Sequence, residues 1–239
     1  MKKGETINNV FAALEREPSV NLHQYPIQLE LQDNALVMEG EVENIRAKKR
    51  LLEVAAGVSG VNGIVDRLML APAETMQDGE IRDHVSRSLS HEKLLDLCAI
   101  WVIVKGKPEV VRETGTEIGS IDVEVNNGVV ILNGSVSSLS EKRLAGVLAW
   151  WVPGSRDVVN GIDVLPPEDD NDDEVVDALR LVLEKEPFIN SSQIKLSSKN
   201  FIVTLEGLVK NEVQRQLAEA DAWYLFGVDG VSNQLMVEE

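Results

Sequence analysis

The stretch GLVKNEVQRQLAEADAWYLFGVDGVSN, residues 207–233, contains the spacing that decides the fold of this chain. Its first glycine, Gly207, is followed twenty residues later by Gly227 and a further six residues on by Asn233. The same spacing occurs twice more, in Gly40, Gly60 and Asp66 and in Gly134, Gly154 and Asn160. Three occurrences in one register identify tandem copies of a single supersecondary unit.

The apolar positions that precede the first glycine of each unit predict a β-hairpin. An alternating apolar run, a short turn and a second apolar run share their offsets in all three units, with Ser198 as the exception. Such alternation is typical of strands with one buried face, and Asn, Asp and Gly tolerate the positive φ of tight turns. The turns fall at Asp33-Asn34, Asn126-Asn127-Gly128 and Lys199-Asn200. The first glycines, Gly40, Gly134 and Gly207, are expected to have positive φ or a close backbone neighbour.

Two helices and a third strand complete each unit. Residues between the two glycines have helical periodicity, and the second glycine is placed where a helix ends, in a position suited to the left-handed conformation. A closing strand follows, and the right-handed crossover rule predicts that it lies parallel to the second strand. Another amphipathic helix precedes each hairpin and stops before Pro18 and Pro187 in the first and third units. The predicted fold class is α+β, with three tandem αββαβ units, each a small three-stranded mixed sheet with two helices on one face.

The predicted domains are residues 1–71, 78–165 and 172–239. The apolar periodicity stops between them, at Ala71-Pro72-Ala73-Glu74 and at Leu165-Pro166-Pro167. A lone unit of this size has a marginal core, which favours packing between units. The second unit contains an insertion near residues 92–120, with about nineteen more residues between its first helix and its hairpin than the first unit has.

The combination of these elements resembles the BON domain family. The residues that carry the resemblance are the G-x-V that ends each second strand (Gly40-Glu41-Val42, Gly134-Ser135-Val136 and Gly207-Leu208-Val209), a basic residue early in the next helix, and the closing Gly227-Val228-Asp229-Gly230-Val231-Ser232-Asn233. The first unit departs from the pattern with Asp66 at the Asn position, and the second with Gly154-Ser155-Arg156. The resemblance implies a non-catalytic binding module of bacterial envelope and osmotic-stress proteins, proposed to contact phospholipid, with no catalytic residue and no cofactor.

The charge of the chain restricts its partners. Its 239 residues include 23 Lys and Arg against 40 Asp and Glu, a net charge of −17. Nucleic acid binding needs cations that neutralise phosphate, so this balance argues against a nucleic acid partner. It also opposes nonspecific adhesion to an anionic bilayer, so a lipid contact has to be local. No run of about 18 apolar residues predicts a transmembrane helix.

The local candidate for a lipid contact is the start of the second helix of the first unit, with Arg46, Lys48, Lys49 and Arg50. The alternative interpretation is a solvated helix face, because each unit keeps one cation at this place, namely Lys48, Lys142 and Arg215.

The insertion of the second unit is the candidate for a partner surface. Its β-branched and aromatic residues predict an added strand over Ile100–Val104, at the sheet edge and ended by Pro108 and the lysines. One interpretation places this strand at the joint between units, with Trp101 largely buried. The other is an apolar partner surface formed by Trp101, Trp150 and Trp151.

No side chains in the sequence form a recognisable catalytic or metal site. His84 and His91 lie two helical turns apart, which is poor spacing for zinc, and Cys98 lies among apolar residues that favour an inert thiol. The acidic run at residues 168–174 lacks the glycine and closing glutamate of a calcium loop, and is interpreted as a linker whose end favours the positive pole of the next helix. The sequence therefore predicts neither an enzyme nor a cofactor.

The expected function is that of a binding or scaffold protein that contacts phospholipid or protein surfaces in a bacterial stress or envelope context. The alternative is a cytoplasmic protein-interaction scaffold centred on the insertion. The polar Gly4-Glu5-Thr6 and the single cysteine favour the cytoplasm for the chain as given, and a trimmed mature form would be periplasmic.

Overall fold

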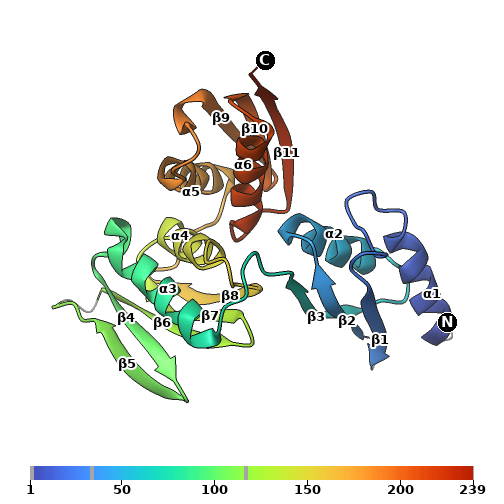
Figure 1. The fold of residues 1–239 in the computed structure, drawn as a ribbon, viewed down its shortest axis with the longest axis horizontal. Helices are drawn as coiled ribbons and strands as arrows, with labels where there is room; N and C mark the ends of the chain where they lie inside the picture. Colours follow the sequence, from blue (N-terminus) through green and yellow to red (C-terminus); the bar gives the residue numbers. More distant parts are fainter. Residues whose placement is uncertain (1–2, 33–34, 116–117, 239) are drawn as a thin grey trace. The chain divides into compact units, whose positions relative to one another are not determined.

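The computed structural model describes residues 3–32, 35–115 and 118–238, and the chain packs as two compact bodies, Met1–Pro72 and Ala73–Glu239. The first body holds the first unit (Figure 1). Its elements are α1 (Lys3–Leu14), β1 (Ile27–Gln32), β2 (Ala35–Val42), α2 (Ile45–Ala56) and β3 (Gly63–Leu70).

The second body holds the second and third units. The second unit consists of α3 (Asp78–His91), the short 3-10 helix η1 (Lys93–Leu95), β4 (Cys98–Val104), β5 (Lys107–Arg112), β6 (Gly119–Asn126), β7 (Val129–Val136), α4 (Leu139–Trp150) and β8 (Asp157–Val164). The third consists of α5 (Asp172–Lys185), η2 (Ser191–Gln193), β9 (Ile194–Lys199), β10 (Ile202–Val209), α6 (Glu212–Tyr224) and β11 (Gly230–Val237).

The predicted α+β fold is confirmed in all three units. In the first sheet, ordered β1-β2-β3, Leu29 lies opposite Met38 in an antiparallel pair and β3 runs parallel to β2. The pairs β7 with β8 and β10 with β11 are likewise parallel, as the crossover rule requires. The second sheet differs from the expected three strands, since its order is β5-β4-β6-β7-β8. The insertion therefore contributes two strands, where the sequence predicted one.

The first glycine of each unit has the expected backbone conformation. Gly40, Gly134 and Gly207 have φ of 148°, 119° and 135°. A Cβ atom at Gly207 would lie 2.0 Å from the carbonyl oxygen of Gln193 on the neighbouring strand. Among the second glycines, Gly60 and Gly227 also have positive φ. Gly154 is required for a different reason, because a side chain at this position would place its Cβ atom 2.6 Å from Cβ of Met76.

An aspartate at the start of a helix stabilises the hairpin turn of the second and third units. Asp78 accepts hydrogen bonds from the backbone N–H groups of Asn127 and Gly128, and Asp172 does the same for Asn200 and Phe201. Asn127 and Gly128 have the predicted positive φ, whereas the third turn lies at Asn200 and Phe201, one residue later than expected. The expected turn at Asp33-Asn34 lies outside the described residues. The contacts show why Phe201 tolerates a φ of 60°: both turn N–H groups are bonded.

The second and third units share one hydrophobic core, which runs from Ile81 to Leu235. The joint between them is built from α4, α5 and α6. At its centre the fully buried guanidinium of Arg143 donates to both carboxylate oxygens of Asp170 at 2.7 and 2.8 Å and to the carbonyl oxygen of Phe226 at 2.9 Å. The acidic linker thus supplies a counter-ion for the joint, and Asn171 caps α5 through the N–H groups of Asp173 and Glu174.

A second polar contact crosses the same joint. Nε1 of Trp151 donates to Oδ1 of Asp221 at 2.8 Å, while Oδ2 of Asp221 is buried without a hydrogen-bond partner. Desolvation raises the pKa of Asp221 to about 7, the negative charge of Glu186 adds to the shift, and the Trp151 hydrogen bond opposes it. Asp221 is therefore a buried carboxyl group that loses its proton, and becomes negatively charged, as the pH rises through about 7.

Candidate binding surface

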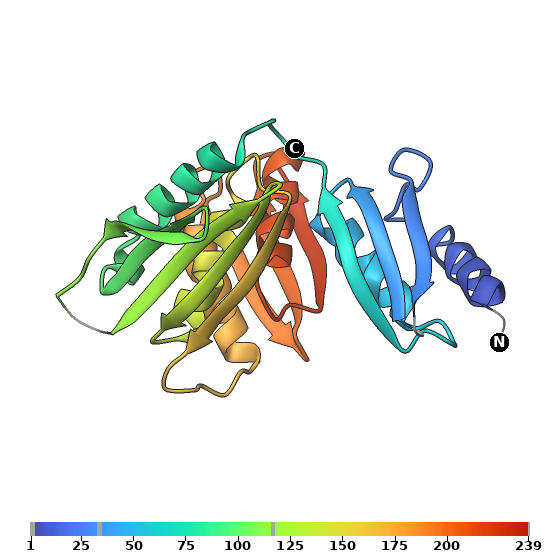
Figure 2. The same cartoon turned by 90° about the horizontal axis from the view of Figure 1, so that it is seen from below.

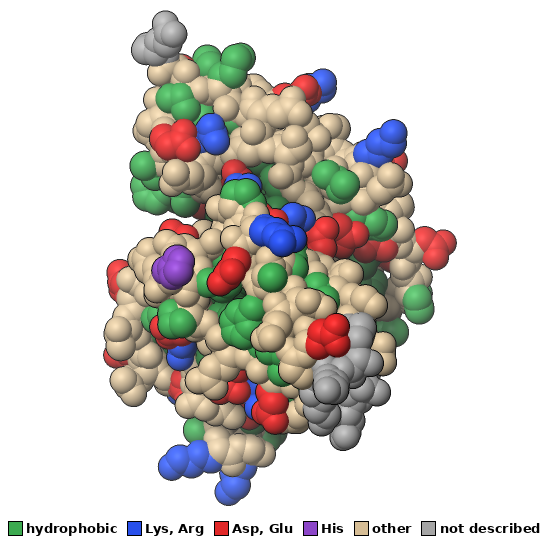
Figure 3. Space-filling view, turned by 90° about the vertical axis from the view of Figure 1, so that its right-hand side faces the viewer, with side chains coloured by type: hydrophobic (Ala, Val, Ile, Leu, Met, Phe, Trp, Pro, Cys, Tyr) green, Lys and Arg blue, Asp and Glu red, His purple; other side chains and the backbone are tan. Residues whose placement is uncertain are grey.

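The four cations proposed for a lipid contact are placed differently from one another. Arg46 is exposed and Lys49 is half-buried, whereas Lys48 is buried and donates to the carbonyl oxygen of Leu68 at 2.7 Å. Lys48 also pairs with Asp66 at 3.0 Å, and Arg50 pairs with Glu17 at 2.8 Å and with Glu53. Lys48 and Arg50 are thus bonded to the first unit itself. On the face drawn in Figure 3, Lys and Arg side chains lie singly or in small groups among acidic and hydrophobic ones.

The Asn at the end of the repeated spacing joins the closing strand to the helix before it. Nδ2 of Asn160 donates to the carbonyl oxygen of Lys142 at 2.8 Å, and Nδ2 of Asn233 donates to that of Arg215 at 3.0 Å. Asp66 has no amide to donate, and the Lys48 ammonium binds it instead. The departure of the first unit from the family pattern is therefore compensated by an ion pair between the same two elements.

Trp150 and Trp151 contact the third unit. The ring of Trp150 stacks on Tyr224 with centroids 5.3 Å apart, and Trp151 binds Asp221. Both residues lie at the end of α4 and pack against α6, so they belong to the contact between the second and third units.

The insertion forms a hairpin on the sheet of the second unit. β4 pairs in parallel with β6, and β5 pairs antiparallel with β4 around a turn at Lys105 and Gly106, both with positive φ. The predicted strand over Ile100–Val104 is confirmed, but it is an inner strand between β5 and β6 and not the sheet edge, and it pairs within its own unit and not at the joint between units. Trp101 is partly buried, so it matches neither the largely buried nor the exposed alternative. Ile100 and Val102 point to the helix side and are buried, while Trp101 lies on the opposite face and is only half-buried.

The helix-free face of this sheet, which we call the open face, combines apolar and acidic side chains. The two helices α3 and α4 lie on one side of the sheet, and Figure 2 shows the other side without a helix over it. Strand register places Val110, Trp101 and Asp122 in one row across β5, β4 and β6. The next row runs through Glu124, Ile131 and Val159, and Val110 and Val159 are 50% and 48% exposed.

The charges on the open face are all negative. Alternation along β6 and β8 places four acidic residues on it, and no Lys or Arg of the five strands points to this side. Asp122 and Glu124 have no hydrogen-bond or ion-pair partner among the described residues, and desolvation raises the pKa of Asp122. Two unpaired carboxylates thus lie among half-buried and exposed apolar side chains. The four acidic residues are Asp122, Glu124, Asp157 and Asp163.

The outer edge of β5 is poorly suited to receive another strand. Pro108 lacks a backbone N–H, Lys107 begins the strand, and the register shifts between Ile100 and Trp101. Proline, lysine and bulges are features by which proteins block edge pairing. The open face, and not the edge, is therefore the candidate for binding.

Among the described residues we find neither a reactive thiol nor a cluster of metal ligands. Cys98 is buried, and desolvation raises the pKa of its thiol, which makes it a weak nucleophile. No cluster of three or more His, Cys, Asp or Glu in residues 3–32, 35–115 and 118–238 has the geometry of a metal site. Within those ranges no helix is long and apolar enough to cross a membrane.

Two solved structures are similar to this chain at low sequence identity. One is the C-terminal domain of CdsD, a structural protein of the type III secretion system of Chlamydia trachomatis, with 14% identity, complete coverage of both chains and a TM-score of 0.24. The other is the PrgH periplasmic domain, with 14% identity, 89% of this chain and 95% of that chain covered, and a TM-score of 0.23. No curated protein matches the sequence.

A family model accounts for most of the chain. The model of the BON domain matches residues 4–72, 107–166 and 171–239. The second match begins at β5, so α3 and β4 precede it, and the other two matches each include a whole αββαβ unit. The chain belongs to the BON domain family.

Proposed function

We propose that this protein is a scaffold that binds another protein through the open face of the five-stranded sheet. BON domains are non-catalytic binding domains. The observation that carries the proposal is the position of Asp122 and Glu124, whose carboxylates lie unpaired on the open face. Asp122 lies between Trp101 of β4 and Asn133 of β7, and Glu124 lies beside Ile131 of β7. Exposed apolar patches of this kind mark interaction surfaces in soluble proteins.

The chemistry of the open face favours one kind of partner. Apolar rows favour a partner that buries aliphatic or aromatic side chains, and the carboxylates favour Lys or Arg placed among them. A partner without basic residues would bury Asp122 and Glu124 unpaired, which is costly. The expected partner is therefore a protein segment with both apolar and basic side chains.

Phospholipid is the competing partner. An anionic headgroup needs exposed cations, and two of the four candidates, Lys48 and Arg50, are already bonded within the first unit. The open face, with only acidic charges, would be repelled by an anionic bilayer. These two features favour a protein partner.

The test compares variants of the full chain as bait in its native extract. Trp101→Ala should lose the proteins that the wild type retains, because aromatic anchors dominate interfaces. Val213→Ala is the matched control, since Val213 is 64% exposed on α6 of the same body. Asp122→Asn combined with Glu124→Gln should weaken retention and reduce its dependence on salt.

Two outcomes would contradict the proposal. One is equal retention by the Trp101→Ala and Val213→Ala variants. The other is cosedimentation of the wild type with anionic vesicles that Arg46→Gln abolishes and Trp101→Ala leaves unchanged. Circular dichroism of each variant shows whether it is folded.

A further inference from the structure

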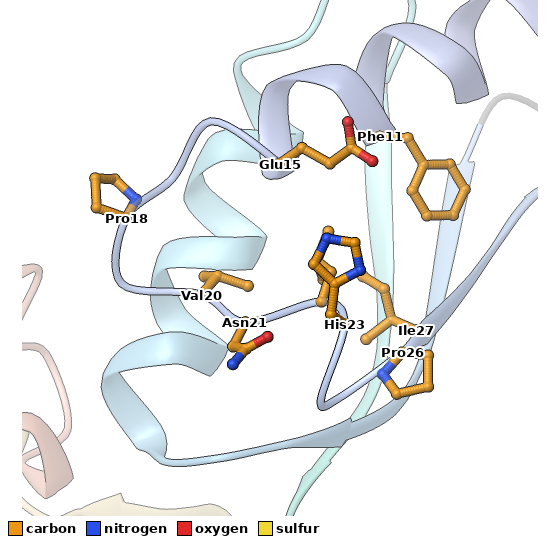
Figure 4. Close-up of a pocket in the computed structure, with 9 residues that line it drawn as sticks. Phe11, Glu15, Pro18, Val20, Asn21, His23, Pro26 and Ile27 are labelled. Carbon is orange, nitrogen blue, oxygen red and sulfur yellow. The ribbon is translucent and has the colours of Figure 1, made fainter.

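The first unit contains a half-open cavity that the proposed scaffold function does not use. It has a volume of about 650 Å³ and lies between the end of α1, the segment at residues 15–26 and the start of β1 (Figure 4). This volume falls within the range of small-molecule sites. Phe11, Leu22, Pro26 and Ile27 supply apolar walls.

The segment that closes the cavity is held in place by its own hydrogen bonds. Ser19 donates to the carboxylate of Glu17 through both its backbone N–H and its hydroxyl, and Arg50 of α2 donates to the same carboxylate. These hydrogen bonds lower the pKa of Glu17 to about 2. Further along, Oδ1 of Asn21 accepts the N–H of Gln24, and the N–H of Tyr25 binds the carbonyl oxygen of Asn21. The cavity is thus largely formed before any ligand enters.

The polar groups of the cavity favour a positive charge. Glu15 is exposed, directly follows α1 and has no hydrogen-bond or ion-pair partner for its carboxylate among the described residues. The carbonyl end of a helix carries negative potential, which adds to that of the carboxylate. Figure 4 shows the Glu15 carboxylate and the Phe11 ring on the α1 side, with the His23 ring facing them from the loop. An anionic ligand would meet repulsion from Glu15.

The aromatic wall of the cavity is specific to the first unit. Phe11 precedes the buried Leu14 by three residues, and the residues that match it in the other units are Ser86, before Leu89, and Arg180, before Leu183. Neither offers an aromatic wall, and Arg180 brings a cation to the place where Phe11 lies.

We infer that this cavity binds an organic amine, a small molecule with a protonated nitrogen on an aliphatic or aromatic body. The ammonium pairs with Glu15 and lies near the Phe11 ring, where the ring face adds cation–π attraction. The apolar body of the ligand packs on Leu22, Pro26 and Ile27. This site goes beyond the proposed scaffold function and lies in the other compact body of the chain.

In the test, the full chain is titrated separately with 2-phenylethylamine, 2-phenylethanol and phenylacetate, and binding is monitored through the NMR chemical shifts of the backbone amides. The amine should shift the signals of residues 11–27 in a saturable way, with a dissociation constant of about 1 mM. The alcohol should bind about fivefold more weakly, since it lacks the charge, and phenylacetate should not bind.

Variants locate the site within the first unit. Glu15→Gln should weaken binding of the amine about fivefold, to the affinity of the alcohol. Phe11→Leu should weaken binding of both the amine and the alcohol. Glu5→Gln is the control, because Glu5 is an exposed carboxylate in the first turn of the same helix. No saturable shift at about 10 mM amine would overturn the inference. Equal binding of amine and alcohol, or equal effects of Glu15→Gln and Glu5→Gln, would also overturn it. None of these results depends on Trp101, so the scaffold proposal can fail or succeed separately.

Discussion

Replacing Asp221 with Asn should make the second body more stable at alkaline pH. Asp221 lies at the joint of the second and third units, with one carboxylate oxygen bonded to Trp151 and the other buried without a partner. Asn keeps the acceptor for Trp151 and removes the charge. The gain should therefore come from the pH range in which Asp221 is ionised.

The size of the effect follows from the pKa. The pKa rises from 3.8, the ordinary value, to about 7 in the folded protein. The folded state then binds more protons than the unfolded state between these values, so wild-type stability falls as pH rises from about 4 to 7 and is constant above. The full cost of the charge is about 4 kcal/mol, and about 2 kcal/mol of it develops between pH 5.5 and pH 8.5.

Tryptophan fluorescence isolates the body in question. All four tryptophans lie in residues 73–239, at positions 101, 150, 151 and 223, so urea unfolding followed by fluorescence reports the second body without the first. The difference in unfolding free energy between Asp221→Asn and wild type should widen by about 2 kcal/mol from pH 5.5 to pH 8.5. A difference that is the same at both pH values would refute the reasoning, because it would mean that Asp221 carries the same charge throughout.

Two further predictions concern stability. In urea unfolding, Gly207→Ala should lower the free energy of unfolding by about 3 kcal/mol or more and Gly40→Ala by about 1 to 2 kcal/mol. The added Cβ would meet a carbonyl oxygen at 2.0 Å in the first case and at 3.0 Å in the second. Equal losses would show that the distance to the carbonyl oxygen does not determine the cost. Lys48→Ala should destabilise the first body by about 2 to 3 kcal/mol, less than a fully buried pair because the Asp66 side chain is 32% exposed. Adding Asp66→Asn should recover part of the loss in thermal unfolding by circular dichroism, since the amide can donate to the helix as Asn160 does; no recovery would argue against that substitution pattern.

The sequence was sufficient for the fold of each unit because hydrophobic offsets recur with the glycine spacing. Leu29, Met38 and Leu68 lie in the strands predicted for them. The parallel direction of the third strand followed from the right-handed crossover rule alone. The positive φ at Gly40, Gly134 and Gly207 was likewise predictable, because only glycine allows it at such close approach.

The insertion was harder because its first strand is apolar throughout. In Cys98–Val104 every residue is hydrophobic, so alternation could not show whether Ile100 or Trp101 faces the core. The second strand, Lys107–Arg112, contains proline and charges and gave no strand signal. The open face therefore became visible only when strand register placed Trp101 beside Asp122.

The ion pair of Lys48 was recognisable in the sequence, but not from the repeated spacing alone. Lys48 matches Lys142 and Arg215, which suggested three solvated cations. Only the first unit, however, has Asp in place of Asn at the end of the spacing, and this coincidence of Lys48 with Asp66 is the signal of their ion pair. The contacts across the joint, such as Arg143 with Asp170, have no such signal because they depend on how two units pack.

The most direct test of the scaffold account is amide hydrogen exchange of the full chain with and without the protein that it retains from its native extract. The account predicts slower exchange in β4, β5, β6 and β7 when the partner is bound, with α2 of the first unit unchanged. Protection confined to residues 45–56 of α2, with none in the five-stranded sheet, would contradict it.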